Sequence, residues 1–153
     1  MTVHAWRIVK PRFASAAFTG QGAKLAGGRW NSPGVAVVYT SESVALGMLE
    51  LLVHIHSEEV LRRYVTIEVL FDDSLVKAVS LAALPRNWRK SPPPAALRRI
   101  GDEWSAAGES AVLRVPSVVV PSGWNFLLNP AHADFGKIAI GEPQPIRMDR
   151  RLG

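Results

Sequence analysis

Cysteine is absent from the 153-residue chain. That absence excludes disulfide bonds, thiolate metal sites and cysteine nucleophiles. No apolar run reaches the roughly 18 residues that a membrane span needs, and residues 1–10 lack the basic-then-apolar order of a signal peptide. These absences favour a cytoplasmic protein, and the length suits one domain over residues 1–153.

Charge is not concentrated in any segment of the chain. Lys and Arg number 18 against 13 Asp and Glu, which gives a net charge of +5, but no lysine-rich tail or aromatic–basic repeat is present. A basic surface attracts nucleic acid, an acidic protein or a phosphorylated small molecule. The charge therefore leaves a non-catalytic basic binding module open as an alternative to an enzyme.

Apolar periodicity predicts more strands than helices. Strands are predicted over residues 4–10, 35–40, 64–71, 111–115 and 118–120, with a closing pair at 137–140 and 145–148. Helices are predicted from a cap at Thr40 or Ser41 to about His56, and from Pro93 to Gly108. Residues 11–34 and 125–135 are predicted to be loops. Because few helices alternate with strands, the fold class is α+β rather than α/β.

The first predicted helix has an unusual outer face. Apolar residues surround it almost completely and leave only a narrow stripe of Gly47, Glu50 and His54, whereas a surface helix usually carries several charges. Two interpretations stay open. Glu50 and His54 are the exposed edge of a nearly buried helix, or the stripe faces a cleft. In the second case Gly47 lets a ligand approach, and Glu50 stabilises a developing cation or takes a proton.

A second candidate cluster surrounds Arg29, which follows Gly27 and Gly28. The planar guanidinium suits phosphate. The segment lacks the spacing of a nucleotide-hydrolase phosphate loop or of a dinucleotide fingerprint, and the pattern alone favours a structural turn for the glycines. Tyr39 ends the predicted strand that follows, where an aromatic ring either packs in the core or stacks on a flat ligand.

Other chemistries find less support in the residues. Ser117, His132 and Asp134 form a triad on paper, but no Gly-x-Ser-x-Gly elbow is present, which disfavours a serine hydrolase. His54 and His56 point in different directions on a helix and make a poor metal pair, and no His-Glu-x-x-His helix occurs. No metal cofactor is expected.

Several short segments, in this order, resemble the RES-domain family, which is named for an arginine, a glutamate and a serine. The matching segments span nearly the whole chain: Trp6–Ile8, Gly27–Asn31, Val38–Ser41, Leu49–Glu50, Leu113–Ser117 and Asn125–His132. Members of this family are the toxins of bacterial RES–Xre type II toxin–antitoxin systems. The resemblance implies an ADP-ribosyltransferase-like fold, a split curved β-core with flanking helices and an NAD+ cleft between its halves.

The resemblance also implies roles for individual residues. Arg29, Glu50 and Ser117 match the residues that name the family, with Ser110 as a weaker candidate for the serine. The implied catalytic residues are Arg29, Glu50, Tyr39 and Ser117. The implied NAD+-binding residues are Arg7, Lys24, Arg29, Tyr39 and Ser117, with Tyr39 near the nicotinamide and Arg7 and Lys24 near the phosphates.

The activity implied by the resemblance is cleavage of the nicotinamide–ribose bond of NAD+, which is the substrate. The acceptor of the ADP-ribose stays open between water, phosphate and a protein side chain, with NAD+ depletion slightly favoured over protein modification. The implied partner is an antitoxin with a helix-turn-helix DNA-binding region that covers the active site. Neither direct nucleic-acid binding nor a membrane is expected.

Overall fold

The computed structural model describes residues 1–55 and 58–152 of the chain. Its strands are β1 (Thr2–Val9), β2 (Val38–Ser41), β3 (Val65–Asp72), β4 (Val76–Ala78), β5 (Val112–Pro116), β6 (Trp124–Leu128), β7 (Ala139–Ile140) and β8 (Gln144–Pro145). Its α-helices are α1 (Gln21–Ala26), α2 (Val44–Ile55), α3 (Glu58–Leu61) and α4 (Ala95–Ala107). Short 3-10 helices are η1 (Pro11–Ala16), η2 (Asp73–Leu75), η3 (Leu81–Ala83), η4 (Phe135–Lys137) and η5 (Arg150–Leu152).

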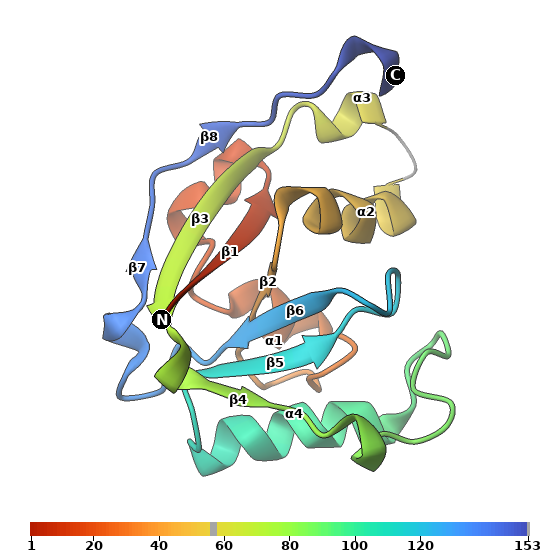
Figure 1. Ribbon diagram of the computed structural model, residues 1–153, viewed down its shortest axis with the longest axis vertical. Coiled ribbons are helices and arrows are strands. Elements are labelled where there is room, and N and C mark those ends of the chain that lie inside the picture. The colour runs from red at the N-terminus through yellow and green to blue at the C-terminus, as the bar shows by residue number, and fades with distance from the viewer. Residues whose placement is uncertain (56–57, 153) are drawn as a thin grey trace.

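The strands form one sheet that is split into two halves. Its order is β4-β5-β6-β2-β1-β3-β7, and β8 also pairs with β3. Strands β1 and β3 pair along their whole length, but β1 and β2 share only the register pair Trp6 and Ser41. Because the halves join at this narrow point, they diverge, as Figure 1 shows. The predicted α+β class and split curved β-core are confirmed.

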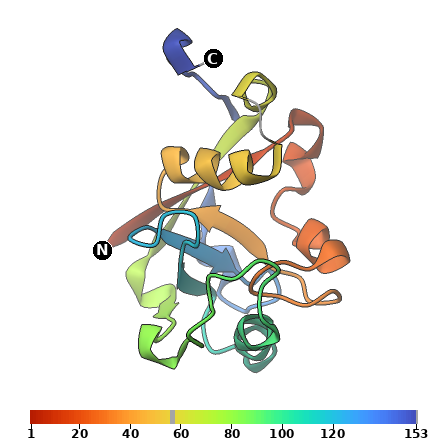
Figure 2. The same ribbon diagram turned by 90° about the vertical axis from the view of Figure 1, so that its right-hand side faces the viewer.

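Apolar residues from both halves fill the interior. Alternation along β3 buries Ile67, Val69 and Phe71, as the sequence pattern predicts. Phe71 meets Phe126 of β6 edge to face across the core, with ring centroids 5.6 Å apart. A second cluster packs Trp104 and its neighbours on α4 against the other face of β5 and β6. Figure 2 views α4 end-on below these strands, with α2 above them.

Helix α4 holds the segment around Arg29 in place. Gly101 of α4 faces Trp30 so closely that a Cβ atom there would lie 1.6 Å from the Trp30 carbonyl oxygen. The Asp102 carboxylate accepts hydrogen bonds from the backbone N–H and the hydroxyl of Ser32, at 2.8 and 2.6 Å. Helix α4 ends at Gly108, as predicted, and this glycine adopts the left-handed conformation. The Arg29 segment is therefore attached to a rigid helix.

The prediction of a loop over residues 125–135 is wrong in its first part. Strand β6 runs from Trp124 to Leu128 between β5 and β2, at the centre of one half of the sheet. Asn125 and Asn129 made the run look like a loop, because asparagine is rare inside strands. Asn125 instead makes hydrogen bonds within the folded protein, so the sheet tolerates it, and Asn129 lies just beyond the end of β6.

Other boundaries also differ from the predictions. Residues 118–120 form no strand, and residues 11–34 contain η1 and α1 rather than an unbroken loop. Ser41 closes β2, while the Ser43 hydroxyl accepts a hydrogen bond from Leu46 N at the start of α2. Over the described residues, no helix is both long and apolar enough to cross a bilayer.

Candidate active site

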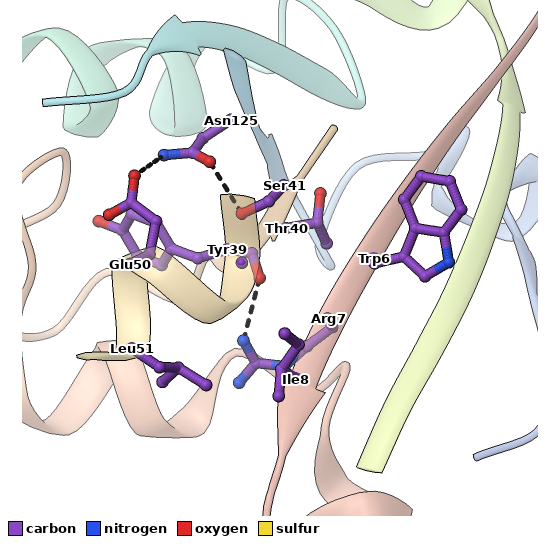
Figure 3. Close-up of a pocket in the computed structure, with 10 residues that line it drawn as sticks. Trp6, Arg7, Ile8, Tyr39, Thr40, Ser41, Glu50, Leu51 and Asn125 are labelled. Carbon is purple, nitrogen blue, oxygen red and sulfur yellow. Dashed lines mark hydrogen bonds between the residues drawn. The ribbon is translucent and has the colours of Figure 1, made fainter. Parts of the chain in front are cut away.

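Glu50 of α2 is fixed through one of its two carboxylate oxygens. Ser117 Oγ donates a hydrogen bond to Glu50 Oε1 at 2.6 Å, and Asn125 Nδ2 donates to the same oxygen at 2.8 Å. Within the described part of the chain, no group donates a hydrogen bond to Glu50 Oε2. Figure 3 shows Asn125 directed at the carboxylate. One oxygen therefore holds the acid in place, and the other is available to a ligand.

Arg29 and Glu50 line the same cavity, which has a volume of about 830 Å³. Arg7, Tyr39, His54 and Arg98 also contribute to its walls. The two principal candidates come from separate segments, the turn before β2 and the middle of α2, and the fold brings them together. A smaller cavity of about 140 Å³, drawn in Figure 3, adjoins it between β1, β2 and α2.

The Arg29 guanidinium is anchored at one nitrogen. Nη1 donates to the carbonyl oxygens of Trp88 and Lys90, at 3.0 and 2.9 Å. Burial lowers the pKa of Arg29, and the nearby charge of Glu50 acts in the opposite direction. An arginine stays charged in proteins. In the described structure, Nη2 and Nε of Arg29 donate no hydrogen bond to the protein. Arg29 therefore keeps N–H donors for an anion in the cavity.

Two further arginines reach the same cavity. Arg7 Nη1 donates to the Tyr39 carbonyl oxygen at 3.1 Å, its Nε is buried without a partner, and burial lowers its pKa. Arg98 Nε donates to the Gly28 carbonyl oxygen at 3.1 Å. Arg98 is not among the residues that the sequence analysis singled out. Lys24, in contrast, is exposed and does not line the cavity.

Tyr39 forms a fixed wall of the cavity. Its hydroxyl donates to Asn31 Oδ1 at 2.6 Å and accepts from Trp30 N at 3.2 Å. Burial raises the pKa of Tyr39 above its ordinary value, so the hydroxyl stays protonated. Because both functions of the hydroxyl are occupied, the ring rather than the oxygen is what Tyr39 offers to a ligand.

The geometry distinguishes between the two candidate serines. Ser117 is completely buried and donates to Glu50, while its Oγ accepts from the N–H groups of Val119 and Val120. Ser110 instead accepts from Trp104 Nε1 and donates to a backbone carbonyl of β5. Of the two serines, Ser117 is therefore the one that contacts Glu50.

The catalytic triad that the sequence disfavoured does not form. The hydroxyl proton of Ser117 is used in the bond to Glu50, and His132 Nδ1 accepts from the backbone N–H of Asp134. His54 lines the large cavity, and His56 lies outside the described residues. Among the described residues, no three His, Asp or Glu side chains gather closely enough to hold a metal ion.

Helix α2 departs from each of the two interpretations of its sequence in one feature, namely the role of Gly47 and the extent to which the helix is buried. Gly47 is buried, and a Cβ atom there would lie 2.9 Å from Ile8 Cδ1, so this glycine lets α2 pack closely on β1. It lines only the smaller of the two cavities. The helix is not nearly buried, because Leu49 and Val53 are 44% and 51% exposed. Of the two interpretations that the sequence left open, the one in which Glu50 faces a cleft agrees with the structure, because Glu50 lines the large cavity.

The fold and the site define an α+β protein with a split β-core and an acid–arginine cleft. A model of the RES domain matches residues 4–149. A protein named Toxin Res from Yersinia enterocolitica is 40% identical over 141 residues, which are 92% of this chain and 92% of that toxin. The chain therefore belongs to the RES-domain toxin family.

Two more comparisons agree with this assignment. A protein named Prs ADP-ribosylating toxin from a Sphingobium species is 39% identical over 140 residues, covering 88% of this chain and 86% of that toxin. A chain in the crystal structure of the M. tuberculosis MbcT–MbcA toxin–antitoxin complex superposes with a TM-score of 0.74 at 14% identity. The match covers 95% of this chain and 85% of that one, and supports the fold.

Proposed function

We propose that this protein is the toxin of a toxin–antitoxin pair and that it cleaves the nicotinamide–ribose bond of NAD+. One observation carries the proposal. Arg29 and Glu50 line one cavity, and the carboxylate is held by Oε1 with Oε2 left without a protein partner in the described structure. A single preorganised carboxylate of this kind can stabilise a developing positive charge.

The residues of the cavity suit the parts of NAD+. Its pyrophosphate needs cationic or N–H donors, which Arg29 and Arg7 offer from the walls of the cavity. The Tyr39 ring supplies a flat surface for the nicotinamide. Arg98 adds a third guanidinium to the same walls, and we assign it a supporting role toward the phosphates.

The chemistry separates into a bond-breaking step and an acceptor step. The ribose–nicotinamide bond breaks, its electron pair leaves with the neutral nicotinamide, and a positively charged, oxocarbenium-like ribose remains. Glu50 lowers the free energy of this cation through its negative charge. An acceptor oxygen or nitrogen then forms the new bond to the ribose and gives up its proton. Tyr39 takes no part in proton transfer, because its hydroxyl stays protonated and hydrogen-bonded.

The identity of the acceptor decides the class of enzyme. Water would make the protein an NAD+ glycohydrolase, phosphate a phosphorylase, and a protein side chain a mono-ADP-ribosyltransferase. A relative at 39% identity is named an ADP-ribosylating toxin, and all three reactions share the first step. NAD+ depletion and protein modification are both routes to inhibited bacterial growth.

We further propose that a cognate antitoxin covers the cavity. The similar MbcT fold was solved in a toxin–antitoxin complex. An antitoxin with a helix-turn-helix DNA-binding region would join inhibition of the enzyme to control of its own synthesis. In this arrangement the toxin itself binds no nucleic acid.

The deciding experiment is incubation of the purified protein with NAD+, with and without phosphate and a bacterial protein extract. Mass spectrometry should detect free nicotinamide together with ADP-ribose, ADP-ribose 1″-phosphate or a modified protein. Intact NAD+ under every condition would refute the proposal and favour the basic binding module. Binding of that module to nucleic acid would weaken steeply with salt, and cleavage of NAD+ would not.

A further inference from the structure

Asn125 connects the candidate acid to the sheet. It lies on β6 directly opposite Ser41 of β2, in an antiparallel register pair. Its Nδ2 donates to Glu50 Oε1 at 2.8 Å, and its Oδ1 accepts from Ser41 Oγ at 2.9 Å. Figure 3 shows this chain of three side chains beside the cavity. A residue expected to lie in a loop therefore contacts the centre of the site.

The Glu50 carboxylate and the Ser41 hydroxyl together determine which way the amide points. The hydroxyl has one proton, and the bond to Asn125 uses it. A flipped amide would turn Oδ1 toward Glu50 Oε1, and two acceptors without a proton between them repel each other. The observed orientation presents the N–H donor to the carboxylate.

The second donor to Glu50 is equally constrained. Ser117 Oγ accepts from two backbone N–H groups, so its proton is directed to the carboxylate. Asn125 and Ser117 thus reach Glu50 Oε1 from two different strand ends. A glutamate on an otherwise half-exposed helix face has several rotamers in which to move. Two donors on one oxygen select the rotamer that leaves Oε2 for the substrate.

We propose that Asn125 is a positioning residue for Glu50, and that Ser41 helps to hold its amide in place through the hydrogen bond to Oδ1. The inference rests on the proposed NAD+ cleavage. Asn125 acts through the acid rather than on the substrate, so it should affect the rate of bond cleavage more than the binding of NAD+. This separation between kcat and KM distinguishes positioning from a purely structural role.

The test is steady-state cleavage of NAD+ by Asn125→Leu, a substitution that keeps the approximate size of the side chain and removes both hydrogen bonds. We expect kcat to fall about tenfold to a hundredfold, since misplacing a reacting group costs on this order. KM for NAD+ should stay within about twofold. The matched control is Asn129→Leu, because Asn129 directly follows β6 and makes two hydrogen bonds, to Ser105 O and from Ala131 N, neither of which involves Glu50.

Asn129→Leu should lower stability and leave kcat per folded molecule unchanged. Wild-type kcat in Asn125→Leu, or a rise of KM with unchanged kcat, would overturn the positioning role. If Asn125→Leu does not fold, Ser41→Ala decides, because it removes only the hydroxyl that helps to hold the amide in place. A several-fold loss of kcat supports the proposal, and none overturns it. Failure of the proposed function is separately visible, since the wild-type protein itself would then leave NAD+ intact.

Discussion

Replacement of Glu50 by glutamine removes one charge and almost nothing else. The glutamine carbonyl oxygen can occupy the place of Oε1 and accept the bonds from Ser117 and Asn125. Its NH2 group then takes the place of Oε2. Because the packing and both hydrogen bonds are retained, we expect the free energy of unfolding to change by less than about 1 kcal/mol.

The magnitude of the catalytic loss follows from the missing charge. Two unit charges about 4 Å apart interact by about 4 kcal/mol at an effective dielectric constant of about 20. Glu50 is half-exposed, so water screens part of this interaction. We therefore expect the activation free energy of bond cleavage to rise by roughly 3 kcal/mol, which corresponds to a loss of about a hundredfold to a thousandfold in kcat.

The assay is release of nicotinamide from NAD+, with binding of NAD+ measured by calorimetry and stability by urea unfolding. Glu50→Gln should bind NAD+ with little change while losing turnover. Glu103→Gln serves as the matched control, because it is the same substitution at an exposed position of α4 outside the cavity. Turnover within about threefold of wild type in Glu50→Gln would refute the role of the carboxylate as a stabiliser of positive charge.

Three further substitutions test the binding site and its support. Arg29→Ala should weaken NAD+ binding about tenfold to a hundredfold, the worth of a charged hydrogen bond, and unchanged affinity in calorimetry would contradict its role. Tyr39→Phe should destabilise the fold by about 1–3 kcal/mol in urea, because both hydrogen bonds of the hydroxyl are lost. An unchanged urea midpoint would refute this. Gly101→Ala should lower the free energy of unfolding by about 3 kcal/mol or more, since the added Cβ atom would overlap the Trp30 carbonyl oxygen. Gly136→Ala, with open space around it, should unfold like wild type, and equal midpoints for both alanine variants would count against the close packing.

Part of the candidate site could be predicted from local pattern. A carboxylate that stands almost alone on an apolar helix, and an arginine after two glycines, are features of single segments. The Glu50 helix and the Arg29 turn therefore stood out before their arrangement was known. Resemblance to a family then paired these residues and added Ser117, which the structure places against Glu50.

Other parts of the site depended on contacts between distant segments. Asn125 and Ser117 are 75 and 67 residues from Glu50 in sequence, and periodicity within a segment carries no information about such pairs. Arg98 was missed for the same reason, since its position on α4 says nothing about the turn it contacts. One sequence interpretation assigned Gly47 to ligand approach. The structure shows that Gly47 packs against Ile8 of β1, a contact that the helix sequence alone does not predict.

The sequence by itself determined the α+β class, most of β1 and β3, and helix α4 with its glycine end, and it singled out Glu50 and Arg29 as candidates. The helices and strands among these features depend on the spacing of apolar residues and on conformational preferences within a single short segment. Only the tertiary structure decided that residues 124–128 form a central strand and that Glu50 is held by one oxygen. Those outcomes depend on hydrogen bonds that form only when β2, β6 and α2 come together in the folded protein. The sequence of a single segment therefore does not predict them.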